Sequence, residues 1–294
     1  MQSIQRKKLR RRVIFYIAGA LVLYLLLSWR LAYTYIHPPR ESVLAPGWIN
    51  IVSIPSPRGS IPAWASPQLA QGHGKPVVFV LVYGYGGTRE AWQDEMCELP
   101  KLGFECVTPC MPGQDESPEK FVGFGYPEAR VVLETVKWVR TQYKKPPKII
   151  LWGVSMGGAA SWLASEQDPT IDGVITEGAY ARFDEAMDHW LGRSGPGASI
   201  YLKPMVWMAS AMDHIDPSKI RPMDSAAKWR KPALVIQAGK DDLIALSHAQ
   251  RLSEGAHCPL WIVPNATHAI VTDKCCRDRL RIRGSTLGLV RRTV

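Results

Sequence analysis

The sequence contains no internal repeat and no low-complexity tract, which excludes a repeat architecture and a long compositionally biased segment. Its six cysteines have no spacing typical of a zinc site, and two of them, Cys275 and Cys276, are adjacent. Free thiols are therefore the default expectation, and no metal site is predicted.

No nucleic-acid recognition module accompanies the positive charge of the chain. The net charge is +10, but six basic residues fall between Arg6 and Arg12 and seven between Lys274 and Arg292. The part between them is close to balanced. This distribution is typical of charge that flanks a membrane segment and of a solvated tail, so no nucleic-acid partner is predicted.

Charged residues are also missing from Val13 to Trp29, which is seventeen residues. At ~1.5 Å per residue this helix would reach ~25 Å, near the lower limit for crossing a bilayer. Residues 13–36 are predicted to form a signal-anchor transmembrane helix with an aromatic interfacial end. The basic residues 1–12 would stay in the cytoplasm, and the rest would lie on the extracytoplasmic side. A cleaved signal peptide is the alternative. It is disfavoured because more apolar residues follow the only small-residue triplet nearby, Ala18-Gly19-Ala20.

The remaining ~250 residues have the composition of a globular domain, since the chain is 46% hydrophobic and 21% charged. After a linker at 37–47, candidate strands alternate with candidate helices. This alternation predicts a mostly parallel, doubly wound sheet of about eight strands, covered on both faces. The strands are expected at 48–54, 61–65, 76–83, 105–108, 148–152, 173–176, 233–237 and 260–263, and three helices at 89–102, 127–143 and 247–255.

The alternation stops between residues 181 and 231, where Trp, Met and Leu residues stand among helix formers. This stretch is interpreted as a helical cap inserted at the carboxyl edge of the sheet. The globular domain is expected to span 48–283. The basic tail at 284–294 is expected to be poorly packed.

One short motif carries the chemistry. Gly153-Val154-Ser155-Met156-Gly157 is a G-x-S-x-G sequence between an apolar strand and a small-residue helix. A turn this tight exposes the hydroxyl of Ser155 in a strained conformation. Side chains at the flanking glycines would collide with the neighbouring strand and helix.

A serine nucleophile needs a base, and the base needs an acid that orients it. Asp241 and Asp242 follow the strand at 233–237, and His268 follows the strand at 260–263. Both loops are expected at the same sheet edge as Ser155. Glu177 also ends a strand and is a further candidate for the acid.

With these motifs, the chain resembles the α/β-hydrolase superfamily over roughly residues 48–272, and it is similar to membrane-anchored serine hydrolases with a small helical cap. The resemblance implies that Ser155 is the nucleophile, Asp241 the acid and His268 the base. The register of Asp241-Asp242-Leu243-Ile244 favours Asp241 over Asp242, and Glu177 is the other alternative.

The same resemblance implies an oxyanion hole made of two backbone N–H groups, those of Tyr85 and Met156. The loop at 83–88 resembles the H-G-x-G-G sequence of the family, with Tyr83 in place of histidine. The loop at 108–117 departs further, since Cys110 and Asp115 replace an aspartate and a glycine. The amphipathic helix that usually closes the fold is not evident after His268.

These features predict a serine hydrolase that cleaves a carboxylic (acyl) ester through an acyl-enzyme, without a metal or organic cofactor. The anchor and the apolar cap favour a lipid-like ester near a membrane. A peptidase or amidase, an acyltransferase, and a non-catalytic binding protein on the same scaffold are the alternatives.

Overall fold

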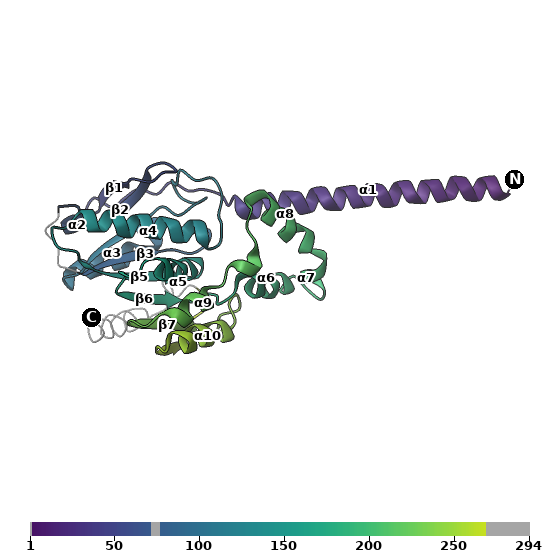
Figure 1. Ribbon diagram of the computed structural model, residues 1–294. Coiled ribbons are helices and arrows are strands. Elements are labelled where there is room, and N and C mark those ends of the chain that lie inside the picture. The colour runs from purple at the N-terminus through teal and green to yellow at the C-terminus, as the bar shows by residue number, and fades with distance from the viewer. Residues whose placement is uncertain (1, 72–76, 269–294) are drawn as a thin grey trace.

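The computed structural model describes residues 2–71 and 77–268, so the tail predicted at 284–294 lies outside the described residues. Its first element is one long helix, α1 (Gln2–Ile36), which projects away from the rest of the molecule (Figure 1). By length and composition, α1 is the one described helix fit to cross a membrane, and a signal sequence would have the same properties. The linker after α1 leads into the sheet.

The centre of the molecule is an eight-stranded sheet in the order β1-β2-β4-β3-β5-β6-β7-β8. Strands β1 and β2 pair antiparallel, β2 pairs antiparallel with β4, and the other neighbours are parallel. The predicted mostly parallel sheet of about eight strands is therefore confirmed. The strands are β1 (Asn50–Ile54), β2 (Ile61–Ala65), β3 (Val77–Val82), β4 (Glu105–Pro109), β5 (Lys148–Val154), β6 (Gly173–Glu177), β7 (Ala233–Ala238) and β8 (Leu260–Val263).

Helices α4, α5, α9 and α10 pack side by side as successive neighbours over the sheet. Helix α5 lies against β3, β5 and β6, and α10 lies against β7 and β8. This layer fixes where the chain turns from β5 into α5, which is the turn that carries Ser155. The helices of the domain outside the cap are α2 (Pro67–Gln71), the 3-10 turn η1 (Arg89–Trp92), α3 (Gln93–Lys101), α4 (Tyr126–Thr141), α5 (Met156–Gln167), α9 (Pro222–Lys228) and α10 (Leu246–Ala256).

The central strands are buried along nearly their whole length, as continuous apolar runs predict for a parallel sheet covered on both faces. Four tryptophans are fully buried, and two of them, Trp92 and Trp152, meet edge to face with ring centroids 5.5 Å apart. The other two are Trp64 and Trp162.

The predicted helical insertion contains α6 (Phe183–Gly192), α7 (Ala198–Tyr201), α8 (Lys203–Asp213), the short turn η2 (Pro217–Lys219) and α9. Helix α9 packs on α5 and α10, so it belongs to the layer over the sheet. The cap proper is made of α6, α7 and α8, and in Figure 1 these helices lie next to the end of α1 where it meets the domain.

Candidate active site

Ser155 lies at the turn between β5 and α5, in a conformation that side chains rarely adopt. Its φ is 53° and its ψ is −119°. Its neighbours along the chain are buried, whereas Ser155 is half-buried. The amide of Ser155 donates to the carbonyl oxygen of Glu177, at 2.7 Å, which ties the turn to β6. The geometry matches the strained strand-to-helix turn predicted from the motif.

The glycines on either side of Ser155 are required by close backbone approach. A Cβ on Gly153 would lie 2.3 Å from the carbonyl oxygen of Gly157. A Cβ on Gly157 would lie 2.2 Å from the carbonyl oxygen of Val82 in β3. Both distances are far shorter than real carbon–oxygen contacts, so helix α5 and strand β3 can come this close only around glycine.

The structure brings Ser155, His268 and Asp241 together at the carboxyl edge of the sheet. Nε2 of His268 lies 3.0 Å from Oγ of Ser155, and Nδ1 of His268 lies 2.8 Å from Oδ2 of Asp241. An ionised carboxylate can only accept, so Nδ1 carries the proton and Nε2 is free to accept from the serine hydroxyl. This tautomer is the one that allows His268 to act as a base toward Ser155.

Asp241 is held in its ionised form by its surroundings. Burial alone would raise the pKa of this carboxyl. The hydrogen bond and charge of His268, together with the amides of Ile244 and Leu243 at 2.9 and 3.0 Å from Oδ1, outweigh burial and lower the pKa below its ordinary value. Gln237 adds a further donor, since its amide nitrogen lies 2.9 Å from Oδ2 of Asp241.

The two alternative acids point elsewhere. The carboxylate of Asp242 is 67% exposed and pairs with Arg193 of the cap. The carboxylate of Glu177 is buried and accepts from the indole nitrogen of Trp152, at 2.7 Å. Of the three candidates, Asp241 is the one that contacts the imidazole of His268.

Gly178 is a support that sequence reasoning missed. It has a φ of +56°, and a Cβ there would lie 3.3 Å from both Oδ2 of Asp241 and Nδ1 of His268. This glycine therefore lets the chain after β6 pass directly beneath the acid and the base. A glycine after a strand is a weak signal on its own, and the need for it becomes visible only once the three loops are placed together.

The loop at 83–88 lies against the serine, as the prediction of an oxyanion hole requires. A Cβ on Gly84 would lie 3.2 Å from Cβ of Ser155. The side chain of Tyr85 lines the same cavity as Ser155 and Met156, and its hydroxyl donates to the carbonyl oxygen of Tyr35 in α1, at 2.8 Å. Burial raises the pKa of Tyr85 to about 12, so its hydroxyl stays protonated as a donor.

The two unusual loops of the sequence support each other. Tyr83, which stands where histidine is usual, accepts from the amide of Met111 at 2.7 Å. Arg89 and Asp115 form a buried bidentate pair with distances of 2.8 and 3.0 Å. Tyr83, Arg89 and Asp115 are all buried, so these contacts hold the loops at 83–88 and 108–117 together.

The described residues contain one group that has the donor types of a metal site, Cys110, Asp115 and Glu116. Both carboxylates already bind the guanidinium of Arg89. Burial raises the pKa of Cys110 to about 12, which keeps it a thiol rather than a metal-binding thiolate. The positive charge of Arg89 occupies the place that a cation would need. The described cysteines Cys97, Cys106, Cys110 and Cys258 are free.

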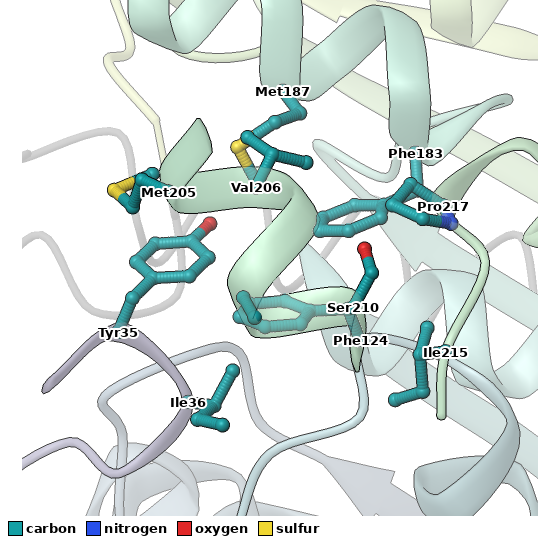
Figure 2. Close-up of a pocket in the computed structure, with 11 residues that line it drawn as sticks. Tyr35, Ile36, Phe124, Phe183, Met187, Met205, Val206, Ser210, Ile215 and Pro217 are labelled. Carbon is teal, nitrogen blue, oxygen red and sulfur yellow. The ribbon is translucent and has the colours of Figure 1, made fainter. Parts of the chain in front are cut away.

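A cavity of about 710 Å³, counted together with its open mouth, lies over Ser155 and His268. Aromatic and aliphatic side chains from the cap, the glycine-rich loop and α1 form its walls. Its wall residues include Tyr35, Phe124, Tyr180, Phe183, Met187 and Trp190. A smaller apolar cavity lies next to it between α1 and α8, and Figure 2 shows Tyr35, Phe124, Phe183 and Met187, which line both.

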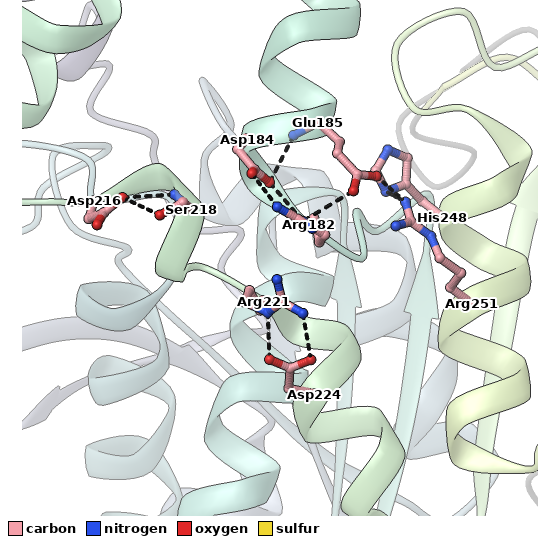
Figure 3. A network of polar contacts seen from close by, with 9 residues as sticks. All are labelled: Arg182, Asp184, Glu185, Asp216, Ser218, Arg221, Asp224, His248 and Arg251. Atoms are coloured by element: carbon pink, nitrogen blue, oxygen red, sulfur yellow. Dashed lines mark hydrogen bonds and ion pairs between the residues drawn. The ribbon is translucent and has the colours of Figure 1, made fainter.

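The base of the cap is joined to α10 by a polar network (Figure 3). Arg251 of α10 donates to Glu185 of α6 at 2.6 Å and to Nδ1 of His248 at 3.0 Å. The same nitrogen of His248 accepts from the amide of Ala181 at 3.1 Å. Burial and the charge of Arg251 lower the pKa of His248 to about 4. The imidazole is therefore neutral, and its Nδ1 can accept from both Arg251 and the amide of Ala181.

A profile of the family described as alpha/beta hydrolase fold matches residues 77–196, which include Ser155. No curated protein matches the sequence. Among solved structures, an esterase of Pyrococcus furiosus is 18% identical, with a TM-score of 0.67 over 86% of this chain and 96% of the other.

Two further structures are similar. A predicted CIB-like hydrolase of Thermoplasma acidophilum is 16% identical, with a TM-score of 0.57 over 83% of this chain and 98% of the other. A metagenome-derived structure from work on the lipolytic enzymes LipS and LipT is 15% identical, with a TM-score of 0.55 over 74% and 95%. The chain has the α/β-hydrolase fold, and the family match supports the α/β-hydrolase superfamily.

Proposed function

We propose that this protein is a serine hydrolase that cleaves carboxylic esters of apolar acyl groups. The observation that carries the proposal is the continuous chain of contacts from Oγ of Ser155 to Nε2 of His268 and from Nδ1 to Asp241. A fixed serine–imidazole–carboxylate arrangement at a strained turn has a direct chemical use in acyl transfer. The hydrolases and esterases among the similar structures support the same class.

In the first step His268 takes the proton of Ser155 as its oxygen attacks the ester carbonyl. The oxygen of the tetrahedral intermediate accepts from the amides of Tyr85 and Met156. The C–O bond to the leaving group then breaks, and His268 returns the proton to the departing alkoxide. Asp241 stays ionised and stabilises the imidazolium that forms.

Water repeats the sequence on the acyl-enzyme. His268 deprotonates the water molecule, the hydroxide adds to the acyl carbon, and Ser155 leaves with the proton. The products are one carboxylic acid and one alcohol for each ester. The proton moves only between side chains and reactants, so the proposed cycle requires no metal or organic cofactor.

The substrate class follows from the walls of the cavity. Its lining is mainly aromatic and aliphatic, and Ser155 and His268 lie together on one part of it. An apolar acyl chain fits these walls better than a peptide, whose backbone N–H and C=O groups would need partners there. We further propose that α1 is an uncleaved single-pass anchor with residues 1–12 in the cytoplasm and the domain at 48–283 outside it.

Substrate profiling of the purified full chain tests this function. Nitrophenyl esters of increasing acyl length are compared with the matching anilides, and Ser155→Ala serves as the inactive control. Ester cleavage that Ser155→Ala abolishes supports the proposal. Faster release from anilides would indicate an amidase. Product that forms mainly with an added alcohol acceptor would indicate an acyltransferase.

A further inference from the structure

Helix α1 carries a buried stripe along the side that faces the cap. Ser28, Ala32 and Ile36 are spaced by four residues and are 5%, 0% and 3% exposed. Helix α8 packs along α1, and the two helices lie side by side in Figure 1. One turn further out, the hydroxyl of Tyr24 donates to the carbonyl oxygen of Tyr201 at the end of α7. The cap therefore follows α1 well beyond the point where α1 leaves the domain.

The position of Tyr24 sets how far the cap reaches. Twelve residues separate Tyr24 from Ile36, which is ~18 Å along a helix. Tyr24 also lies five residues inside the uncharged segment that ends at Trp29, which is ~8 Å. A cap that touches Tyr24 cannot remain in water if this uncharged segment crosses the bilayer. The depth of ~8 Å agrees with the ~5–10 Å to which interfacial amphipathic helices sink.

The outer surface of the cap suits that depth. Ile200 is 73% exposed, Tyr201 48% and Trp207 66%. Between Pro204 and Met212 the sequence of α8 contains no charged residue, and Lys203 at its start has a side chain long enough to snorkel. Exposed tryptophan and tyrosine beside aliphatic residues are typical of a membrane–water interface.

The same corner of the molecule leads to the serine. Tyr35, in the last turn of α1, lines both the catalytic cavity and the apolar cavity between α1 and α8. Its ring packs on Phe124 at 4.9 Å, on Tyr85 at 5.3 Å and on Trp190 at 5.3 Å between centroids. Two neighbouring cavities that share these aromatic walls therefore lie between the seam of α1 with α8 and Ser155.

We propose that α7 and α8 are immersed in the bilayer beside α1, and that the catalytic cavity takes its acyl ester directly from membrane lipid. The exposed surface of α7 and α8 is thus covered by the acyl chains of the bilayer. Continuity with α1 argues for it, because the exposed residues of the cap extend the apolar surface of α1. The substrate part of the inference rests on the proposed ester hydrolase function, whereas the immersion of the cap rests on the proposed crossing of the bilayer by α1.

The immersion is tested by tryptophan quenching in full-length protein reconstituted in phosphatidylcholine vesicles. Lipid brominated in its acyl chains quenches indoles at membrane depth. The Trp207→Phe variant is expected to lose part of the quenched signal of the wild-type protein. Trp229→Phe is the matched control, since Trp229 is buried against Trp162 and its loss should not lower the quenched fraction. An unchanged quenched signal in Trp207→Phe would overturn the immersion.

The delivery of substrate is tested with one substitution at two equally exposed sites. Ile200 on the cap is 73% exposed, and Ile51 is 70% exposed on β1, a strand that Figure 1 shows apart from the cap helices. The readout is the rate on a long-chain monoacylglycerol in vesicles, divided by the rate on nitrophenyl butanoate in water. Ile200→Glu should lower this ratio about tenfold or more, because a charge is costly in the bilayer. Ile51→Glu should leave the ratio unchanged.

The outcomes separate the two proposals. A ratio that falls equally in both variants, or in neither, would contradict delivery from the membrane. Suppose that the wild-type protein cleaves no ester while the Trp207→Phe variant still has a smaller quenched signal than wild type. In that case the immersion stands and the proposed esterase function is wrong. Ester cleavage without any difference in quenching would leave the enzyme intact and refute the immersed cap.

Discussion

The sheet edge around Ser155 and the cap above it are held in place by different forces. At the sheet edge, backbone groups approach within distances that only glycine permits, and both carboxylate oxygens of Asp241 accept hydrogen bonds. In the cap, α8 packs along α1, and polar contacts join the cap to its surroundings at separate points, such as Arg251 with Glu185 and Arg193 with Asp242. The first region tolerates almost no displacement, whereas the second has surfaces that can slide and repack.

Because of this difference in rigidity, we expect the sheet edge to determine the chemical step and the cap to determine which substrate is accepted. Substitutions at the sheet edge should abolish turnover because they remove a group or a distance that the reaction needs. Substitutions in the cap should change which esters are cleaved, because apolar packing tolerates exchange when volume is kept.

The two adjacent aspartates provide the sharpest contrast at the sheet edge. Asp241→Asn should lower kcat by about 10⁴-fold, because an amide favours the wrong tautomer of His268. Asp242→Asn is the matched control and should change kcat by less than about threefold, since this exposed carboxylate only pairs with Arg193. Steady-state kinetics with one ester checks both. A larger loss in Asp242→Asn than in Asp241→Asn would contradict the assignment of the acid.

The buried pair between Arg89 and Asp115 tests how rigidly the loops at the sheet edge are held. Arg89→Met leaves the carboxylate of Asp115 buried without its cation, and should destabilise the fold by about 3–5 kcal/mol. The same substitution at Lys101, whose partner Glu98 is on the surface, should cost less than about 1 kcal/mol. Denaturant titrations of both variants measure the difference, and equal losses would refute it.

The base of the cap should loosen in mild acid through His248. The pKa of His248 is lowered to about 4 in the folded protein. Its ordinary value is ~6.5, so the unfolded chain binds a proton between these two values and the folded protein does not. The contribution of His248 to stability is thus complete above ~6.5 and is lost as the pH falls toward ~4, by up to about 3 kcal/mol.

Unfolding midpoints between neutral and mildly acidic pH, compared for wild type and His248→Gln, measure this contribution. The variant lacks the titrating ring and should lose less stability on acidification than the wild-type protein. A steeper acid dependence in His248→Gln would show that other groups govern the cap.

The smallest predicted effect concerns Gly178, beneath Asp241 and His268. Gly178→Ala places a side chain in a left-handed backbone conformation, and its Cβ would press on Asp241 and His268. Because this displaces the acid and the base, the substitution should lower kcat by about tenfold. Gly192→Ala in α6 is the control, because a Cβ there meets nothing within 4 Å. It should keep full activity. Equal activity of the two variants would show that the acid–base pair has room to move.

Most of the sheet could be predicted because the strands at its centre, such as β3 and β5, are mainly apolar runs. The strand at 260–263 has the predicted bounds, and β5 only extends the prediction to Val154. The predicted helix at 89–102 begins instead with the 3-10 turn η1 before α3. That turn is where Arg89 bends back to reach Asp115, a contact that depends on two distant loops.

The motif residues could be found because strand ends and chain order fix them, and the structure brings Ser155, Asp241 and His268 together. Gln237, Gly178 and Tyr35 could not be found in the same way. Gln237 and Gly178 act through distances of about three ångströms that no sequence pattern encodes. Tyr35 reaches the cavity only because the last turns of α1 pack against the cap, 120 residues before Ser155 in the chain.

The central claim is that the hydroxyl of Ser155 is a nucleophile activated by His268. Its most direct test is the site of covalent labelling by a fluorophosphonate, mapped by peptide mass spectrometry on wild type, Ser155→Ala and His268→Ala. We expect one phosphonylated residue, Ser155, with labelling absent in Ser155→Ala and slowed at least about 10³-fold in His268→Ala. Equally fast labelling of the His268→Ala variant, or an adduct on another residue, would contradict the account.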